Sequence, residues 1–294
     1  MEKLETFAPK SLKKSPLRSQ SAMEYLMTYG WAILILAVIL GAFYQLGVFN
    51  SNSFATRALP GSCQVVRPGG QYTTTFISLE GECLNNLPKY TAFFDYGTVV
   101  VPAAEMPSGT APRTIIAWIN PNSEGGNTGI FYYGGTNCNP DGAVFGLIIS
   151  SGNLFLWGSC DDVSSSVQIP LNTWSFVAVN YTGSTASMFY NGKLADGPFS
   201  YSSDACDSSV CSNAYIGGYS GWWGGQYSGE IANLQIYNPS LSANEIQALY
   251  QEGIGGAPID LKHLVGWWPL NGNTNDTSGN GNNGVPYGIE FKSS

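Results

Sequence analysis

Oxygen donors gather in one short stretch near the end of the 294-residue chain, and this stretch is the candidate for metal chemistry. Within residues 271–283, Asp276, Asn280 and Asn282 lie among glycine, serine and threonine. Calcium takes about six to eight oxygen ligands from carboxylates, amides and carbonyls. The stretch has one carboxylate and does not follow the spacing of an EF-hand loop. Two interpretations stay open: a structural calcium site, or an Asn- and Gly-rich turn that satisfies its own backbone.

Two adjacent tryptophans, Trp222 and Trp223, lie in the glycine-rich stretch GGYSGWWGGQYSG. Aromatic rings on a flexible backbone stack on sugar rings or on the surface of a partner protein. The pair is therefore the candidate ligand surface. The alternative is that one ring is buried while the other covers a sheet edge.

Catalytic arrangements are not evident in the sequence. The single histidine, His263, has no nucleophile beside it, and no glycine-rich phosphate loop leads from a strand into a helix. A glycosidase needs two facing carboxylates, and Glu230 is one acid of suitable type. We therefore expect a protein that is not an enzyme, with an anchored glycoside hydrolase as a remote alternative.

The six cysteines all follow residue 62, and none has a C-x-x-C spacing. With a single histidine in the chain, a zinc site is not expected. An even number of cysteines beyond a membrane segment favours disulfides. We expect the sequence-local pairs Cys63–Cys83, Cys138–Cys160 and Cys206–Cys211, with six reduced, buried thiols as the alternative. Two N-glycosylation sequons begin at Asn180 and Asn275.

An apolar segment near the N-terminus determines on which side of a membrane the candidate residues above are expected to lie. Residues 20–49 read QSAMEYLMTYGWAILILAVILGAFYQLGVF, and no charged residue follows Glu24 before Arg57. A bilayer core about 30 Å thick needs about 20 mostly apolar residues in a helix, so we expect a transmembrane helix. Five basic residues precede it, and the positive-inside rule places them in the cytoplasm and the residues after Phe49 outside.

Composition narrows the class of the remaining chain. After Ser19 there are 7 basic and 18 acidic residues, which excludes a nucleic-acid partner because phosphate binding needs a basic surface. Glycine (36 residues) and aromatic residues (13%) are plentiful, and helix-forming runs are rare after residue 50. This profile is typical of a mainly β protein with many turns.

Short strand-like runs recur about every ten residues between Lys89 and Gly253, separated by Gly, Asn, Ser and Pro. Examples are RTIIAWINP, AVFGLIIS, TWSFVAVNYT and EIANLQIYNP. This spacing predicts an antiparallel sandwich or jelly roll. One helix is expected in NPSLSANEIQALYQEG, with Ser242 as its N-cap and Glu245 at the capping-box position.

These runs resemble the laminin-G-like, concanavalin A-like jelly rolls. LNTWSFVAVNYTGSTASMFYNGKLAD resembles the central strand pair of that family, and YSGEIANLQIYNPSLSANEIQALYQEG resembles its closing strand and helix. The resemblance implies a jelly roll over residues 89–253, and related domains often carry structural calcium. Such folds host many functions, so the resemblance does not select a ligand.

The motif LVGWWPLNGNTNDTSGNGNNG resembles the opening of this family, yet here it comes last. We expect a circularly permuted domain in which residues 254–294 form a linker and a C-terminal strand that completes the jelly roll. A truncated second copy is the alternative. On such a strand, side chains alternate between faces, so Trp267 and Trp268 should divide between the core and the outside.

The N-terminal residues resemble the class III signal peptide of an archaeal type IV pilin-like protein. The match consists of the basic leader, the polar QSAMEY junction and the uninterrupted helix. It implies that a prepilin peptidase removes leader residues 1–19 by cutting between Ser19 and Gln20, with Ser19 in place of the usual glycine. Glu24, matched together with Tyr25, would then pair with the new amino terminus of Gln20 on a neighbouring copy.

Taken together, the sequence predicts a structural protein of the cell membrane and extracellular surface. Helix 20–49 would bundle with other copies in a filament, residues 50–88 would form a short β stalk or first strands, and the jelly roll would bind glycans or surface proteins. The alternative is a single-span membrane-anchored carbohydrate- or protein-binding module that does not polymerise.

Overall fold

The computed structural model describes residues 22–45, 87–123, 125–135, 143–206, 211–218 and 225–293. The chain divides into two units, Met1–Phe54 and Ala55–Ser294. The first contains helix α1 (Ala22–Gln45). None of the helices within the described ranges is long and apolar enough to cross a membrane. Ser19 and Gln20, and the side chains of Glu24 and Tyr25, lie outside what the structure describes.

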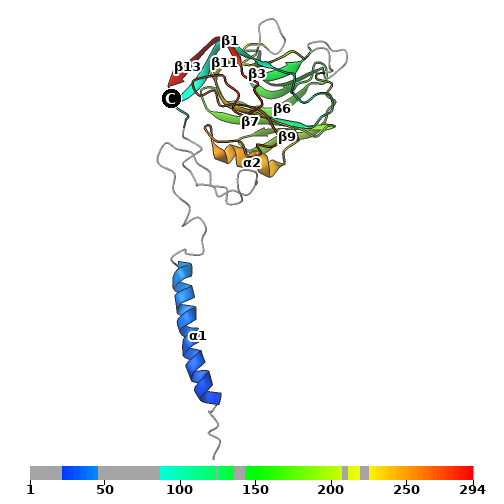
Figure 1. Cartoon of the computed structure of the whole chain (residues 1–294). Coiled ribbons are helices and arrows are strands. Elements are labelled where there is room, and N and C mark those ends of the chain that lie inside the picture. The colour runs from blue at the N-terminus through cyan, green and yellow to red at the C-terminus, as the bar shows by residue number, and fades with distance from the viewer. Residues whose placement is uncertain are drawn as a thin grey trace, which may run out of the picture. The chain divides into compact units, whose positions relative to one another are not determined.

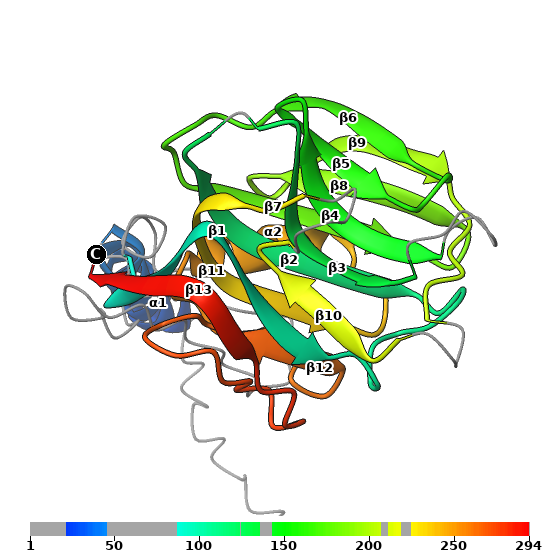
Figure 2. The same ribbon diagram turned by 90° about the horizontal axis from the view of Figure 1, so that it is seen from above.

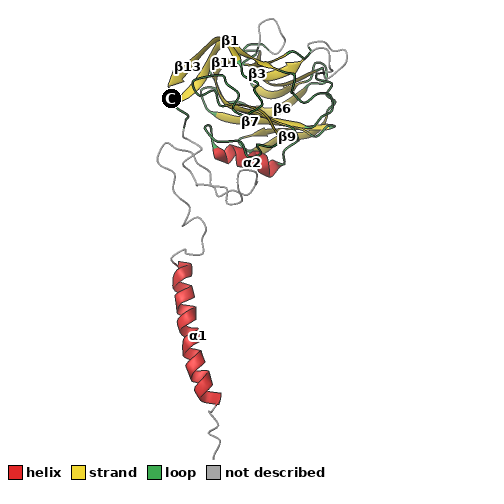
Figure 3. Cartoon of the chain, viewed as in Figure 1, coloured by secondary structure: helices red, strands yellow, loops and turns green. Residues whose placement is uncertain are grey.

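The second unit is a β-sandwich with one short helix (Figures 1 and 3). Its elements in chain order are β1 (Tyr90–Pro102), β2 (Arg113–Pro121), β3 (Asn127–Gly134), β4 (Val144–Ser150), β5 (Asn153–Trp157), β6 (Val163–Gln168), β7 (Ser175–Tyr181), β8 (Thr185–Tyr190), β9 (Lys193–Ser200), β10 (Asn213–Ile216), β11 (Ser228–Tyr237), α2 (Ala243–Glu252), β12 (Leu264–Trp268) and β13 (Val285–Ser293).

The strands follow one continuous path, β6-β5-β4-β3-β10-β1-β11-β2-β7-β8-β9, with β12 added to β11 and β13 added to β1. Strand β1 belongs to both layers of the sandwich, which Figure 2 shows from above. Its first half pairs with β11 and its second half with β10. The change occurs at Tyr96, where φ is +58° and the register of β1 against β13 shifts. This irregularity turns the strand from one layer into the other.

The core lies between the two layers and is lined by alternate residues of the strands. Phe145 and Leu147 of β4 face Val177 and Val179 of β7 within one buried cluster. Strands buried on both faces read as near-continuous apolar runs, which explains why RTIIAWINP and SFVAVNY carry so few polar residues. The mainly β sandwich expected from the sequence is confirmed.

Helix α2 covers the outer face of the layer that contains β2, β7 and β11. Ser242 accepts a hydrogen bond from the backbone nitrogen of Glu245, and the Glu245 carboxylate accepts one from the backbone nitrogen of Ser242. This reciprocal capping box was expected from the sequence and is present. Ile246 and Leu249 are buried in a second apolar cluster, and Tyr250 stacks on Trp118 of β2 at 5.6 Å between ring centroids.

The C-terminal segment joins the same sheet as the earlier strands. β12 pairs with β11, and β13 pairs with β1 from Tyr90↔Ser293 to Val100↔Val285. Trp268 is fully buried in the central core, while Trp267 is half-buried against the cluster beneath α2. The two tryptophans therefore divide between the two faces of the strand, as alternation along β12 requires.

Candidate functional site

Three aromatic side chains form a row across the outer face of the layer opposite α2. Tyr215 of β10 pairs with Tyr132 of β3, Tyr132 with Gly146 of β4, and Gly146 with Trp157 of β5. Residues directly opposite each other in a sheet share a face. We call Tyr215, Tyr132 and Trp157 the aromatic row. Their neighbours Phe131 and Tyr133 point the other way, into the core.

Each ring of the aromatic row contacts the next ring along the row. Tyr132 and Trp157 meet edge to face at 5.2 Å between centroids, and Tyr132 lies 5.5 Å from Tyr215. Tyr132 and Trp157 are buried, whereas Tyr215 and the adjoining Phe155 are half-buried. Aromatic pairs in such arrangements are worth about 0.5–1.5 kcal/mol beyond the area that they bury. The contact with Tyr132 therefore favours one orientation of the half-buried Tyr215 ring at the edge of the cluster.

Gly146 lets the two buried rings meet. A Cβ atom at this position would lie 2.9 Å from Cβ of Tyr132 and 3.4 Å from Cβ of Trp157. The first distance is shorter than van der Waals contact, so any side chain there would separate the rings. From the sequence, Tyr132 and Trp157 are expected to be core and sheet-surface residues rather than a site, and both are buried. Their contact with Tyr215 was not foreseen, because it depends on the register of three strands.

The expected ligand residues Trp222 and Trp223 lie outside the described residues. The structure does describe the residues that flank them. Gly218, two residues beyond β10, forms an antiparallel bridge with Gln226, just before β11. Since Tyr215 belongs to β10, the segment that carries the two tryptophans begins and ends beside the strand that supplies one ring of the aromatic row.

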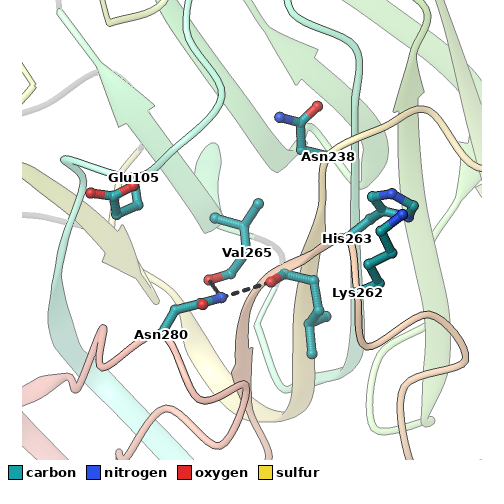
Figure 4. A pocket seen from close by; sticks show the side chains of 7 residues that line it. Glu105, Asn238, Lys262, His263, Val265 and Asn280 are labelled. Atoms are coloured by element: carbon teal, nitrogen blue, oxygen red, sulfur yellow. Dashed lines mark hydrogen bonds between the residues drawn. The ribbon is translucent and has the colours of Figure 1, made fainter. Parts of the chain in front are cut away.

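A polar pocket with a volume of about 440 Å³ lies elsewhere on the domain, around the start of β12 (Figure 4). It is lined by Glu105, Asn238, Lys262, His263, Leu264, Val265 and Asn280. Figure 4 shows Glu105 on one side, with Lys262 and His263 on the other. The imidazole Nδ1 of His263 lies 2.7 Å from Oδ2 of Asp260. Sequence reasoning set His263 aside as isolated and did not find this pocket.

The oxygen-rich stretch considered for calcium, residues 271–283, is hydrogen-bonded to the edge of β12 that faces away from β11. Oδ1 of Asp276 accepts hydrogen bonds from the backbone nitrogens of Trp267 (3.0 Å) and Ser278 (2.8 Å), and Oδ2 accepts one from that of Asn282 (2.9 Å). Nδ2 of Asn280 donates to the carbonyls of Leu264 and Val265.

These contacts give the stretch a structural role that needs no ion. Nδ2 of Asn282 also donates to the Val265 carbonyl, and its own carbonyl accepts from Nε1 of Trp268. Unpaired strand edges are protected in many proteins by covering loops, and here side-chain amides and one carboxylate do so. Calcium binding at Asp276, Asn280 and Asn282 stays a prediction. Within the described residues no cluster of three or more His, Cys, Asp or Glu side chains is suited to a metal.

Glu230, the acid considered for glycoside hydrolysis, is tied to its neighbours. Oε1 accepts from Oγ1 of Thr91 (2.6 Å), and Oε2 accepts from Nδ2 of Asn120 (3.0 Å). Phe93 of β1 pairs with Glu230 on one side and with Glu290 on the other. The two acids therefore lie on one face of the sheet with Phe93 between them, about 10 Å apart at about 4.8 Å per strand.

The remaining expected residues have mixed outcomes. Cys206 and Cys211 are disulfide-bonded, as expected. Cys160 is also disulfide-bonded, while Cys63, Cys83 and Cys138 lie outside the described residues. Of the two sequons, Asn275 is exposed. Asn180 is half-buried, and its Nδ2 donates to the Leu241 carbonyl at 2.9 Å, so this amide is engaged in packing. Glycosylation at either sequon stays a prediction.

A family model described as the concanavalin A-like lectin/glucanases superfamily matches residues 94–247, which run from the middle of β1 into α2. The chain belongs to this superfamily. Strands β12 and β13 lie beyond the matched residues, although they pair with strands inside them. No curated protein sequence matches this concanavalin A-like chain.

Solved structures share the concanavalin A-like fold at low identity. A candidate carbohydrate-binding protein from Bacteroides ovatus is 16% identical, with a TM-score of 0.55, over 70% of this chain and 60% of that one. The chain thus spans less than two thirds of that protein. A SAP-like pentraxin from Limulus polyphemus is 15% identical (TM-score 0.45, 70% and 96% covered). The CBM40 module of Ruminococcus gnavus IT-sialidase is 17% identical (TM-score 0.44, 55% and 96% covered). At these identities the likeness concerns the fold alone.

Proposed function

We propose that the β-sandwich is a carbohydrate-binding module held at the cell surface, and that the half-buried edge of the aromatic row, Tyr215 with the adjoining Phe155, contacts the sugar. The observation that carries the proposal is the row of Tyr215, Tyr132 and Trp157 on an outer sheet face, with ring contacts at 5.2 and 5.5 Å. Sugars present C–H faces to aromatic rings, and rigid rings lose little entropy on binding. Membership of a superfamily of lectins and glucanases supports a saccharide ligand.

Binding by the full-length protein to a glycan array tests this proposal. Replacing the half-buried Tyr215 by Ala removes one ring of the row, and we expect affinity to fall at least about fivefold, the value of one aromatic contact. Tyr250→Ala is the matched control, because Tyr250 is also a half-buried tyrosine and stacks on Trp118 at 5.6 Å on the opposite layer. Equal losses in the two variants would contradict the proposal.

The module is proposed to bind saccharides without cleaving them. If it were instead an anchored glycoside hydrolase, the full-length protein would release sugars from a polysaccharide that it binds, and Glu230→Gln would abolish the release. The hydrogen bonds from Thr91 and Asn120 to both carboxylate oxygens of Glu230 support a structural role. We expect no released product from either protein.

For the N-terminal segment we propose the role of a pilin-like filament helix. The support is the sequence: a basic leader, the QSAMEY junction and an apolar run without charge after Glu24. A carboxylate at the edge of the membrane core is costly unless it is paired, and the amino terminus of a processed neighbour would pair with it. N-terminal sequencing of native protein should find Gln20 first. A chain that begins at Met1 and forms no filament would favour the non-polymerising anchor.

A further inference from the structure

Strand β13 has a free edge at the margin of the sandwich (Figure 2). It pairs with β1 on one side, and within the described residues no other segment is hydrogen-bonded to its backbone. Seven of its nine residues are exposed, and the other two are half-buried. An unpaired strand edge presents a row of backbone N–H and C=O groups that another strand can bind.

The other terminal strands of the sheet are protected. β6 and β9 end the strand path, and Oδ2 of Asp196 on β9 joins them by accepting hydrogen bonds from the backbone nitrogen (2.6 Å) and Oγ (2.8 Å) of Ser166 on β6. The edge of β12 is covered by residues 271–283. Of these four terminal strands, β13 alone has an edge that no described segment covers.

The second half of β13 is the part suited to pairing with another strand. Gly288 has a φ of +64°, which interrupts the extended backbone. Before this interruption, Pro286 has no N–H group to donate to a ladder. Residues 289–293 follow the interruption and lie opposite the first residues of β1 without a further shift of register.

The side chains of this half alternate between two faces, as in any strand. Ile289 and Phe291 are half-buried and pack against the central core. Glu290 and Lys292 are exposed on the outer face, where the ammonium of Lys292 lies over the ring of Phe93. One acid and one base thus stand two residues apart on the same exposed face.

This arrangement makes the end of β13 complementary to a second copy of itself. Residues directly opposite each other in an antiparallel pair share a face. Two copies aligned about Phe291 therefore place Glu290 of each copy opposite Lys292 of the other. Alignment about Glu290 would instead set like charges opposite each other, which is destabilising. Alignment about Phe291 also brings the two half-buried Phe291 rings together on the inner face.

We propose that two copies of this chain associate by antiparallel pairing of residues 289–293 about a two-fold axis at Phe291. The pairing supplies the free edge of β13 with backbone hydrogen bonds and continues the sheet of one copy into the sheet of the other. It also covers the half-buried side chains of Ile289 and Phe291. A contact that uses the same patch on both copies closes as a dimer and does not propagate.

The contact is small, so the dimer is expected to be weak in dilute solution. Copies gathered through their N-terminal helices would meet at a high effective concentration, which strengthens a weak second contact. This gain rests on the filament role proposed above, whereas the pairing of β13 does not depend on it.

Charge reversal on the outer face tests the proposed alignment. The dissociation constant of the dimer is measured by sedimentation of full-length protein in detergent micelles. Glu290→Lys and Lys292→Glu each turn two attractive pairs into two repulsive ones, so we expect each to raise this constant about tenfold. An equal mixture of the two variants restores opposite charges at both positions and should form mixed dimers as tight as those of the unmodified protein. Lys193→Glu, an exposed lysine of β9, is the matched control and should have no effect.

Cross-linking shows whether the two charges meet between copies. A carbodiimide joins a carboxylate to an amine in contact with it by an amide bond and takes up the water that is lost. We expect isotope-labelled and unlabelled protein, mixed before the reaction, to give a Glu290–Lys292 cross-link with one labelled and one unlabelled half. Links within single copies alone would contradict the proposal.

Two further results would also overturn it. The first is a dissociation constant that both charge variants leave unchanged, or a mixture of them that forms no mixed dimers. The second is a monomer in which the backbone N–H groups of residues 289–293 resist hydrogen exchange, because another segment would then occupy the edge. The filament role is tested separately by the N-terminal residue of the native protein, which these variants do not alter.

Discussion

The guanidinium of Arg113 and the hydroxyl of Tyr133 share a hydrogen bond of 2.7 Å between Nη1 and the phenolic oxygen, and both side chains are fully buried. The guanidinium carbon also lies 4.8 Å from the ring centroid of Phe145. A buried charge is tolerated when its donors are satisfied. Here aromatic faces and oxygen acceptors surround it within the central core.

The same guanidinium fixes the loop between β1 and β2. Nη1 donates to the Pro107 carbonyl (2.7 Å), Nε to the Ala111 carbonyl (2.9 Å), and Nη2 to the Gly109 carbonyl. This loop also carries Glu105 into the pocket of Figure 4. Arg113 is therefore a positioning residue for one wall of that pocket.

Arg113→Met should destabilise the domain strongly. The substitution removes the donors to the half-buried carbonyls of Gly109 and Ala111 and leaves the Pro107 carbonyl with the Tyr133 hydroxyl alone. Each group that loses its partner where water cannot reach costs about 1–3 kcal/mol. We expect a total loss of about 3 kcal/mol or more in the free energy of unfolding, measured by urea denaturation. Lys193→Met, which removes an exposed lysine of β9, is the control and should change stability by less than about 0.5 kcal/mol. Similar losses in both variants would refute the anchoring role.

Alkaline pH should destabilise the β-sandwich. Burial raises the pKa of Tyr133, Tyr201 and Tyr227 above the ordinary value of 10.0. The unfolded chain then releases protons above about pH 10 that the folded domain retains. The free energy of unfolding therefore has its full value below about pH 10 and falls as the pH rises further. Denaturation between pH 8 and pH 11 will measure this fall.

Tyr227→Phe removes one of these three hydroxyl protons, so the free energy of unfolding should fall less steeply as the pH rises above about 10. Tyr287→Phe is the control, because its side chain is 57% exposed on β13 and its loss should leave the slope unchanged. Parallel slopes for Tyr227→Phe and the unmodified protein would show that burial of Tyr227 does not govern the effect.

Gly146→Ala should damage the aromatic row. The added methyl would lie 2.9 Å from Cβ of Tyr132, and overpacking of this kind costs about 1–3 kcal/mol. We expect lower stability together with weaker glycan binding. Gly126→Ala is the matched control, since nothing lies within 4 Å of a Cβ placed there. Binding that survives a clear loss of stability in Gly146→Ala would separate the row from the ligand.

Asp276→Asn should destabilise the C-terminal segment even without calcium. An amide keeps a single acceptor oxygen for the three backbone nitrogens of Trp267, Ser278 and Asn282, and hydrogen bonds to a charged group are worth about 1.5–3 kcal/mol. In thermal unfolding with EDTA present, we expect a lower Tm for Asp276→Asn than for the unmodified protein. A calcium-dependent rise in Tm that disappears in the variant would show an ion at this loop. Asn275→Gln, at an exposed neighbour, is the control.

Local patterns in the sequence were enough for several elements. Ser242 and Glu245 predict the start of α2 because a capping box uses residues three apart in the chain. The division of Trp267 and Trp268 between two faces follows from strand alternation alone. The recurring apolar runs indicate the sandwich, and one sequence-local disulfide, Cys206–Cys211, was expected and is present.

The sites depend on contacts that no local pattern contains. Tyr215 meets Tyr132 across 83 positions of sequence because of strand register, and a shift of one residue would turn these rings to the other face. Arg113 is the first residue of β2, and the carbonyls of the loop before that strand accept hydrogen bonds from its guanidinium. The role of Asp276 depends on where β12 runs. Circular permutation of the domain and assembly through Glu24 stay predictions.

The pairing of β1 with β13 has a consequence for biosynthesis. Tyr90, at the start of the sandwich, is opposite Ser293, almost at the last residue of the chain. Translation delivers a chain from its N-terminus, so β13 is synthesised after every other described strand of the domain. Until β13 is made, one side of β1 has no strand to pair with.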